Sequence, residues 1–152
     1  KGPGKLSPFT VPFMIADIQK KEIQAEKLKV LQIGLVYLFG SHAEGVAGLS
    51  SDIDIGVVFT DPSVARGNTT RVYNKLFDIF SEAFDMSNFR TIDIVFLERA
   101  SLELRFDAIS HGALLFEHSA DFRLDFEERT AALYRDFRPL LKEFNRAVLE
   151  KI

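Results

Sequence analysis

The chain has 152 residues, of which 47% are hydrophobic, and a formal net charge of −3. This length suits one domain, residues 1–152, with a hydrophobic core of its own. The absence of cysteine excludes disulfides, thiolate metal sites and cysteine nucleophiles, and it fits a cytoplasmic protein. The net charge argues against direct binding to nucleic acid, and no apolar run has the length of a membrane span.

The chain is predicted to begin with an arm, a helix and two strands. Gly and Pro gather in residues 1–11, which indicates a flexible arm. Apolar residues then recur at helical spacing, which predicts an amphipathic helix over residues 12–33 with Gly34 as its left-handed C-cap. A continuous apolar run predicts a buried strand over 35–39, and a second strand, 52–59, follows a small polar loop.

Helices and strands then alternate along the chain. The spacing of apolar residues predicts a helix over 66–86, a strand over 91–97, a helix over 101–110 with Ser101 as N-cap, and a short strand over 113–116. The resulting order, α-β-β-α-β-α-β-α, predicts an α+β fold with a small mixed sheet of about four strands flanked by helices.

The C-terminal segment, residues 121–152, is predicted to be one long helical segment. Its apolar residues alternate at steps of four and three from Phe126 to Ala147. Proline removes a backbone hydrogen bond and clashes with the preceding turn, so a kink or break is expected near Pro139. The apolar stripe has two interpretations. It packs on its own domain, which is the ordinary case, or part of it docks a partner or a second copy of this chain.

Three aspartates form a candidate metal site. Asp52 and Asp54 stand two apart in a strand and therefore point to the same face. Adjacent carboxylates repel each other, and a divalent cation is the simplest reason to keep them. Asp93 lies within reach because neighbouring strands are about 4.7–4.9 Å apart. Mg²⁺ prefers such oxygen ligands, and two ions can clamp the attacking and leaving oxygens of an in-line displacement. We therefore predict that these three residues are catalytic and bind Mg²⁺, as two ions.

A glycine and a serine precede these aspartates. Gly40 permits close approach of the backbone, and Ser41 supplies a hydroxyl and a backbone N–H. N–H groups at a helix N-terminus or in a nest bind anions and suit a triphosphate. Gly40 and Ser41 are therefore predicted to bind the nucleotide.

The pattern GS-x10-DxD, with a later strand aspartate, resembles the nucleotidyltransferase superfamily typified by DNA polymerase beta. The length and the Phe-rich C-terminal helix look most like the minimal nucleotidyltransferases (MNT) that act as antitoxins of HEPN toxins. In that family the antitoxin moves AMP from ATP onto a tyrosine of the HEPN toxin, an RNase, and so silences it. The resemblance implies a polymerase-beta-type palm, metal binding by Asp52, Asp54 and Asp93, and contacts from Gly40 and Ser41 to the phosphates of ATP.

One position departs from the family pattern. Many relatives read GS-x-A-R-G, whereas this chain reads GSHAEG, so Glu44 stands where those relatives have an arginine. A carboxylate there weakens the affinity for an anionic nucleotide. Arg66, Arg71 and Lys75 in the next helix are the candidates to compensate.

Two alternative functions remain open. In the first, the chain transfers the nucleotide to a small molecule such as an antibiotic, although the chain is short for a second substrate domain. Alternatively, the chain is a catalytically weak antitoxin that works by binding alone, an alternative kept open by Glu44. Tyr37, Tyr73 and Tyr134 are candidates for self-modification, but packing is the expected role of all three.

Overall fold

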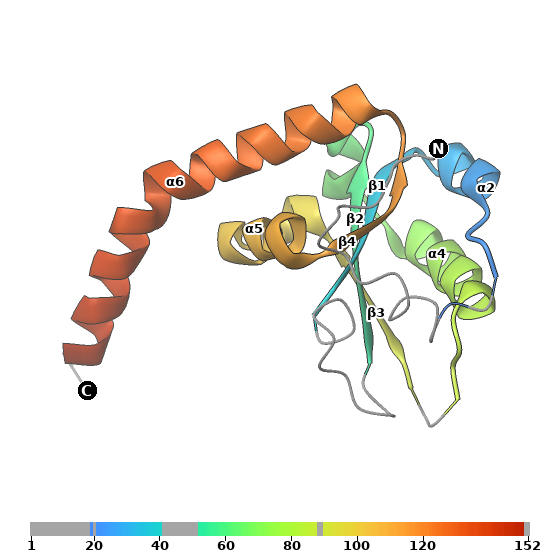
Figure 1. Ribbon diagram of the computed structural model, residues 1–152, viewed down its shortest axis with the longest axis horizontal. Helices are drawn as coiled ribbons and strands as arrows, with labels where there is room; N and C mark the ends of the chain where they lie inside the picture. The colour runs from blue at the N-terminus through green and yellow to red at the C-terminus, as the bar shows by residue number, and fades with distance from the viewer. Residues whose placement is uncertain (1–18, 20, 41–51, 88–89, 151–152) are drawn as a thin grey trace.

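The computed structural model describes residues 19, 21–40, 52–87 and 90–150, and a mixed four-stranded sheet lies at its centre (Figure 1). The strand order is β3-β2-β1-β4. β1 pairs antiparallel with both β2 and β4, whereas β2 pairs parallel with β3. The strands are β1 (Ile33–Phe39), β2 (Ile53–Phe59), β3 (Ile92–Phe96) and β4 (Ala113–Glu117).

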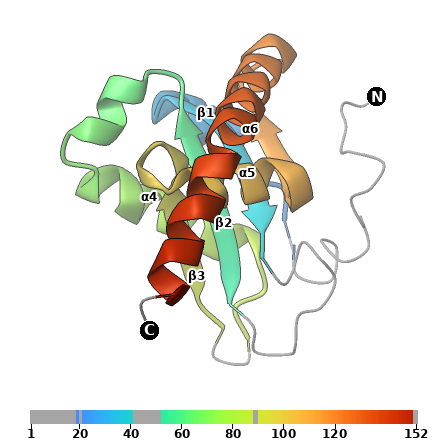
Figure 2. The ribbon, with the colours of Figure 1, turned by 90° about the vertical axis from the view of Figure 1, so that its left-hand side faces the viewer.

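Helices cover both faces of this sheet (Figures 1 and 2). One hydrophobic cluster joins the sheet to α2 and α4 through Leu28, Leu76 and Phe80. A second cluster, on the other face, joins it to α5 and to the first half of α6 through Ala108 and Phe126. The helices are α2 (Ala25–Val30), η1 (Pro62–Arg66), α4 (Thr70–Ala83), η2 (Leu97–Arg99), α5 (Leu102–His111) and α6 (Ala120–Glu150).

The predicted strands are confirmed to within two residues. β1 is buried along its whole length because both of its neighbours are strands and both sheet faces are covered, as its continuous apolar run indicates. The N-cap of α5 is also confirmed, since the hydroxyl of Ser101 accepts a hydrogen bond from the N–H of Leu104 at 3.1 Å. The predicted α+β class is therefore correct.

Among the described residues, the helix predicted over residues 12–33 is confirmed for α2 alone and is wrong for residues 19, 21–24 and 31–33. Residue 19 forms an isolated bridge with Phe84, and the N–H of Lys21 donates to the carbonyl of Ala83 at 3.2 Å. This stretch is therefore held against the end of α4. Residues 12–18 and 20 lie outside the described residues, as does the predicted arm, 1–11.

The predicted C-cap at Gly34 is also wrong, because the chain enters β1 one residue earlier. The left-handed residue after α2 is Gln32, with φ 62°. Gly34 lies inside β1, where a β-carbon would stand 2.5 Å from a ring carbon of Phe122. The glycine there serves the close approach of α6 to the sheet rather than a turn.

The expected kink or break near Pro139 is present as a kink. α6 continues through Pro139, and its ribbon changes direction as its colour passes from orange to red (Figure 1). The first half buries Phe126 and Thr130 on the domain, which confirms the first interpretation of the stripe for that half. In the second half Leu140 and Phe144 are exposed, so the same interpretation is wrong there. No helix among the described residues has the length and apolar character needed to cross a bilayer.

A polar network fixes the first half of α6 to the sheet. The hydroxyl of Tyr37 donates to Glu127 at 2.6 Å, and burial is the main cause that raises the pKa of this phenol far above its usual range. Arg123 donates to Glu117 in β4 at 2.6 Å and to Glu127 at 3.4 Å. Tyr37 is 2% exposed, so its predicted packing role is confirmed.

The other two tyrosines also pack against aromatic rings. Tyr73 meets Phe96 edge-on, with ring centroids 6.5 Å apart. Tyr134 stacks on Phe106, with centroids 4.0 Å apart, and so joins α6 to α5. Packing is therefore the structural role of both residues.

Gly112 joins α5 to β4, and we predict that its replacement by Ala destabilises the fold. A β-carbon at this position would collide with the backbone carbonyl of Ala108 and stand 3.0 Å from that of Leu38. Neither carbonyl can move without disturbing its own element, so the free energy of unfolding of Gly112→Ala should fall by about 1–3 kcal/mol in urea. Gly67→Ala is the matched control, because a β-carbon there would be in ordinary contact, 3.7 Å from the carbonyl oxygen of Val64. Equal stability of the two variants would contradict this interpretation.

Glu98 should make stability depend on pH. Its Oε2 accepts the N–H of Phe59 at 2.7 Å, and burial is the largest influence, raising the pKa of this carboxyl above 4.5. The folded state then binds more protons than the unfolded state between the two pKa values, so stability falls as pH rises through that interval. Glu98→Gln keeps the acceptor and cannot ionise. The measurement is the free energy of unfolding in denaturant between about pH 4 and pH 8. As the pH rises above the ordinary carboxyl pKa, the wild type should lose stability relative to Glu98→Gln. A constant difference between the two proteins would contradict the expectation.

Candidate functional site

Two of the predicted carboxylates stand side by side at the start of parallel strands. Asp54 is the second residue of β2, and its Cα partner in β3 is Asp93. On its other side, Asp54 is paired with Phe39 at the end of β1. Adjacent strands lie about 4.7–4.9 Å apart, and residues paired in register share a face of the sheet. The fold therefore brings Asp54 and Asp93 together, as predicted.

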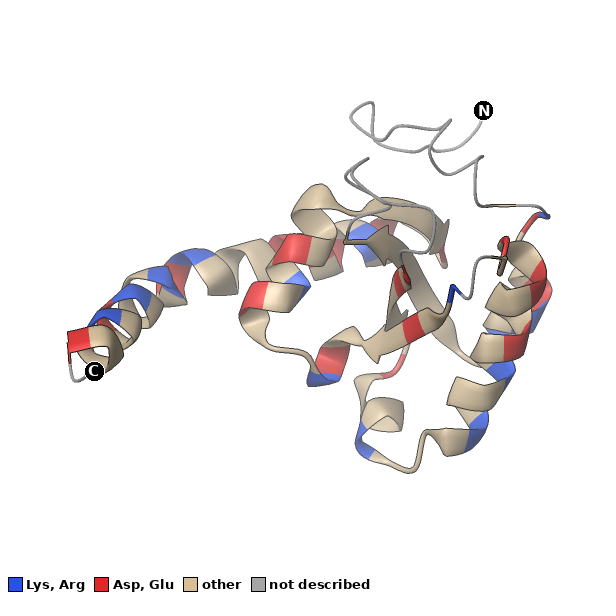
Figure 3. Ribbon diagram, turned by 90° about the horizontal axis from the view of Figure 1, so that it is seen from below, with Lys and Arg blue, Asp and Glu red and all other residues tan. Residues whose placement is uncertain are grey.

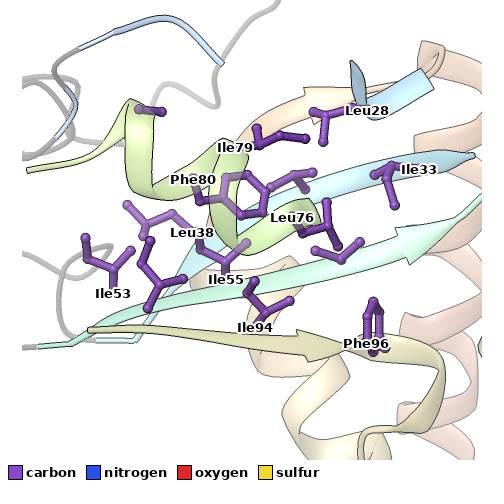
Figure 4. Close-up of a cluster of buried hydrophobic side chains, with 14 of the residues drawn as sticks. Leu28, Ile33, Leu38, Ile53, Ile55, Leu76, Ile79, Phe80, Ile94 and Phe96 are labelled. Carbon is purple, nitrogen blue, oxygen red and sulfur yellow. The ribbon is translucent and has the colours of Figure 1, made fainter. Parts of the chain in front are cut away.

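The alternation of isoleucine with aspartate orients these carboxylates. Ile53 and Ile55 in β2, and Ile92 and Ile94 in β3, are buried in the cluster beneath α4. Figure 4 shows Ile53, Ile55 and Ile94 on the side of the sheet that faces Phe80. Successive strand residues point to opposite faces, so Asp54 and Asp93 project from the other face. Asp54 is half-buried and Asp93 is exposed.

Asp52 lies immediately before β2 and is tied to β3. Its Oδ1 accepts a hydrogen bond from the backbone N–H of Thr91 at 3.3 Å, and its side chain is exposed. Thr91 directly precedes β3, so this bond fixes Asp52 at the same end of the sheet as Asp54 and Asp93. All three predicted aspartates therefore lie at one edge.

Gly40 places the end of β1 directly against Asp54. Its φ is 75°, in the left-handed region that favours glycine. A β-carbon at this position would collide with Oδ2 of Asp54. The glycine is thus required by its conformation and by the close approach of the carboxylate. Ser41, the other predicted nucleotide-binding residue, lies outside the described residues, as does Glu44.

The donor chemistry of this edge fits a hard cation. Carboxylate oxygens are the ligands that Mg²⁺ prefers, and Mg²⁺ in nucleotide enzymes is bound by one or two carboxylates together with water and substrate phosphates. In the part of the chain that the structure describes, no three Asp, Glu or His side chains are already gathered as a complete metal site. The aspartates therefore fit an ion that the substrate helps to bind, rather than a closed protein cage.

Arg66 does not lie near these carboxylates. The guanidinium of Arg99, in η2, donates to the carbonyls of Ala65 and Gly67 at 2.6 and 2.9 Å. Those contacts hold the neighbours of Arg66 beside η2, which follows the end of β3, whereas Asp93 lies near the beginning of β3. The end of the strand is roughly 10 Å from Asp93 at about 3.3 Å per residue. Arg66 therefore does not compensate for the acidic residue at position 44.

Arg71 and Lys75 also lie away from the carboxylates. Both belong to the first half of α4, while the last residue of this helix, Ala83, is the end from which the chain returns to β3. Together with Lys27 and Val30 of α2 they line an open groove of about 910 Å³. This groove lies on the α2 and α4 side of the sheet, opposite the face from which Asp54 and Asp93 project.

Arg90 is a residue near the site that sequence reasoning missed. It is 8% exposed, and its Nη1 donates to the carbonyl of Asp85 at 2.7 Å. It directly precedes Thr91, whose N–H binds Asp52, so it anchors the loop that presents that hydrogen bond. The available signal was its position: an arginine just before a strand that carries a site aspartate lies at the same edge of the sheet.

A comparison with solved structures finds the same fold in toxin–antitoxin complexes. A chain of a toxin–antitoxin crystal structure with AMP-PNP has a TM-score of 0.61 and 24% identity, over 82% of this chain and 94% of that chain. A chain of the tri-AMPylated HEPN toxin of Shewanella oneidensis in complex with its MNT antitoxin has a TM-score of 0.54 and 23% identity, over 82% and 94%. A MntA–HepT toxin–antitoxin chain has a TM-score of 0.54 and 22% identity, over 82% and 95%.

A comparison with curated protein sequences finds no match. A family model does match, and its range, residues 20–121, runs from before α2 to the start of α6 and contains all three aspartates. The family is described as Polymerase beta, Nucleotidyltransferase. The match covers more than half of the chain, and the sheet and its acidic edge agree with it. This chain therefore belongs to the polymerase beta nucleotidyltransferase family, and its fold is similar to that of chains in toxin–antitoxin complexes.

Proposed function

We propose that this chain moves AMP from ATP onto a tyrosine hydroxyl of a HEPN toxin and so acts as its antitoxin. The observation that carries the proposal is the pairing of Asp54 with Asp93 beside the backbone of Gly40 at one edge of the sheet. The likeness to chains from a toxin–antitoxin with AMP-PNP and from an AMPylated HEPN toxin complex supports this nucleotide and this acceptor.

The reaction is a displacement at the α-phosphorus of ATP. The acceptor oxygen forms a bond to that phosphorus, the bond from it to the bridging oxygen of pyrophosphate breaks, and pyrophosphate leaves. Asp52, Asp54 and Asp93 would hold Mg²⁺, which when bound neutralises the charge of the phosphates. Asp93 is the exposed member of the in-register pair, and its carboxylate is the group that accepts the proton of the attacking hydroxyl.

The remaining residues of the edge position these groups. Gly40 lets the backbone at the end of β1 lie directly against the carboxylate of Asp54. The N–H of Thr91 holds one oxygen of Asp52. Arg90 fixes the loop from which that N–H points. The chain thus supplies a pre-positioned acidic edge, and positioning with charge stabilisation is most of what phosphoryl-type transfer requires.

A second candidate is inhibition by binding alone. The location of Arg66, Arg71 and Lys75 favours it, because none of these cations is at the acidic edge to offset the acidic residue at position 44. A cell-protection assay separates the two functions. A variant that lacks the carboxylates of Asp54 and Asp93 but still protects cells fully from the toxin supports binding alone.

Removal of the paired carboxylates should abolish AMP transfer. We expect Asp54→Asn and Asp93→Asn each to lower the rate at least about 100-fold, since each removes charge that stabilises the transition state. The measurement is transfer of label from α-labelled ATP, with Mg²⁺, to the purified toxin encoded beside this chain. Asp78→Asn, on the exposed face of α4, is the matched control and should transfer at the wild-type rate. Transfer that survives both site substitutions would show that the acidic edge is not the active site.

Gly40→Ala should also impair transfer, by displacing Asp54 rather than by removing a charge. The new β-carbon collides with the Asp54 carboxylate, and the left-handed backbone adds a cost of roughly 1–2 kcal/mol for a residue other than glycine. The rate should fall more than about tenfold while the protein remains folded by circular dichroism. Gly67→Ala again serves as the control with an unchanged rate. A wild-type rate in Gly40→Ala would mean that Asp54 does not need its present position.

A further inference from the structure

The second half of α6 carries an apolar stripe that nothing in the described part of the chain covers. Figure 1 shows this half extending away from the body of the molecule. Leu140 is 62% exposed and Phe144 is 67% exposed. The stripe begins at Leu133, just before this half, and continues through Phe137, Leu140, Leu141, Phe144 and Val148. Leu141 is half-buried, and the other five are exposed. Such a contiguous apolar surface on a helix indicates a contact with another macromolecule.

The width of the stripe indicates what kind of surface fits it. At 100° per residue, its six members fall within an arc of about 100° around the helix. This is the width of a helix face buried in a core or bundle, and it is broader than the two-position seam of a two-stranded coiled coil. The complementary surface is therefore a groove formed by helices rather than one partner helix.

A row of carboxylates runs along one border of the stripe. Asp136, Glu143 and Glu150 are spaced seven apart, so they lie on the same side of the helix, next to the apolar arc. Glu143 is paired with Arg146 at 2.7 Å, but both side chains are about two-thirds exposed, so a partner's cation replaces that pair at little cost. Lys and Arg lie elsewhere on the helix, which carries charges of both signs (Figure 3).

A second copy of this chain does not fit the stripe. Antiparallel pairing of two α6 helices would bring the acidic row of one copy against the acidic row of the other, and like charges along a helix border disfavour that pairing. Parallel pairing would continue onto the face of Phe126 and Thr130, which the chain's own domain already buries to 8% and 3% exposure. Both arrangements are therefore opposed by features of the chain itself.

We propose that the second half of α6 is the docking surface for the acceptor protein, which binds it in an apolar helical groove with Lys or Arg along the border that faces Asp136, Glu143 and Glu150. The identity of the acceptor in this inference rests on the proposed function, whereas the location of the docking surface rests on the exposed stripe of α6. It places docking on an element separate from the acidic edge of the sheet. Affinity for the acceptor and the rate of AMP transfer are then set by different residues.

The test measures binding of the full-length chain to the purified toxin encoded beside it, by isothermal titration calorimetry at two salt concentrations. We expect Leu140→Ser with Phe144→Ser to weaken binding at least about 30-fold, as for buried apolar anchors. Asp136→Lys with Glu143→Lys should weaken it about tenfold or more, and more strongly at low salt. Arg135→Ser with Lys142→Ser, on the opposite side of the helix, is the matched control with unchanged affinity. All of these side chains are exposed, and circular dichroism checks that each variant is folded.

The outcomes separate this inference from the proposed function. The Asp54→Asn, Asp93→Asn variant should bind the toxin with wild-type affinity, even if it transfers no AMP. Binding through α6 without any AMP transfer by wild type would support the docking surface and overturn the enzymatic proposal. AMP transfer with affinity unaffected by the α6 substitutions would overturn the docking surface alone. A chain that forms a dimer in light scattering, and that becomes monomeric in Leu140→Ser with Phe144→Ser, would also overturn it.

Discussion

The alternation of isoleucine and aspartate at the start of β2 and β3 is the constraint on which the rest of the structure depends. Ile53 and Ile92 are buried beneath α4, so their neighbours Asp54 and Asp93 must project from the opposite face. A register change of one residue would bury two carboxylates and expose the isoleucines, which neither the core nor the site tolerates. The same burial that stabilises the sheet therefore fixes the geometry of its acidic edge.

The other elements serve this edge in distinct ways. Directly after β1, Gly40 brings the backbone against Asp54, and Thr91, next to the buried Arg90, donates its N–H to Asp52. Helix α6 packs on the face of the sheet from which Asp54 and Asp93 project, and the contact between Tyr37 and Glu127 joins it to β1. The acidic edge and the anchored helix thus share one element, β1.

Much of this arrangement could be predicted from the sequence, because short-range patterns encode it. The buried strands, the helix that begins after Ser101 and the projection of Asp54 away from the core all follow from periods of two and of 3.6 residues. The errors arose where tertiary contacts, rather than local patterns, determine the secondary structure or the position of a side chain. The stretch before α2 has helical spacing, yet residue 19 pairs with Phe84 and the strand β1 takes residues 33 and 34. Likewise, no local pattern reveals on which face of the sheet α4 places Arg71, or that the side chain of Arg90 is buried.

The junction at Pro139 divides α6 into two segments that should exchange their amide protons very differently. The first segment is packed on the sheet through Phe126, so its amide protons exchange only when the whole domain unfolds. The second has about the length at which an isolated helix is marginal in water, and it lacks the backbone N–H that proline cannot supply. Its helical hydrogen bonds therefore have little local protection of their own. Ordering of this segment and association with another protein become a single thermodynamic step.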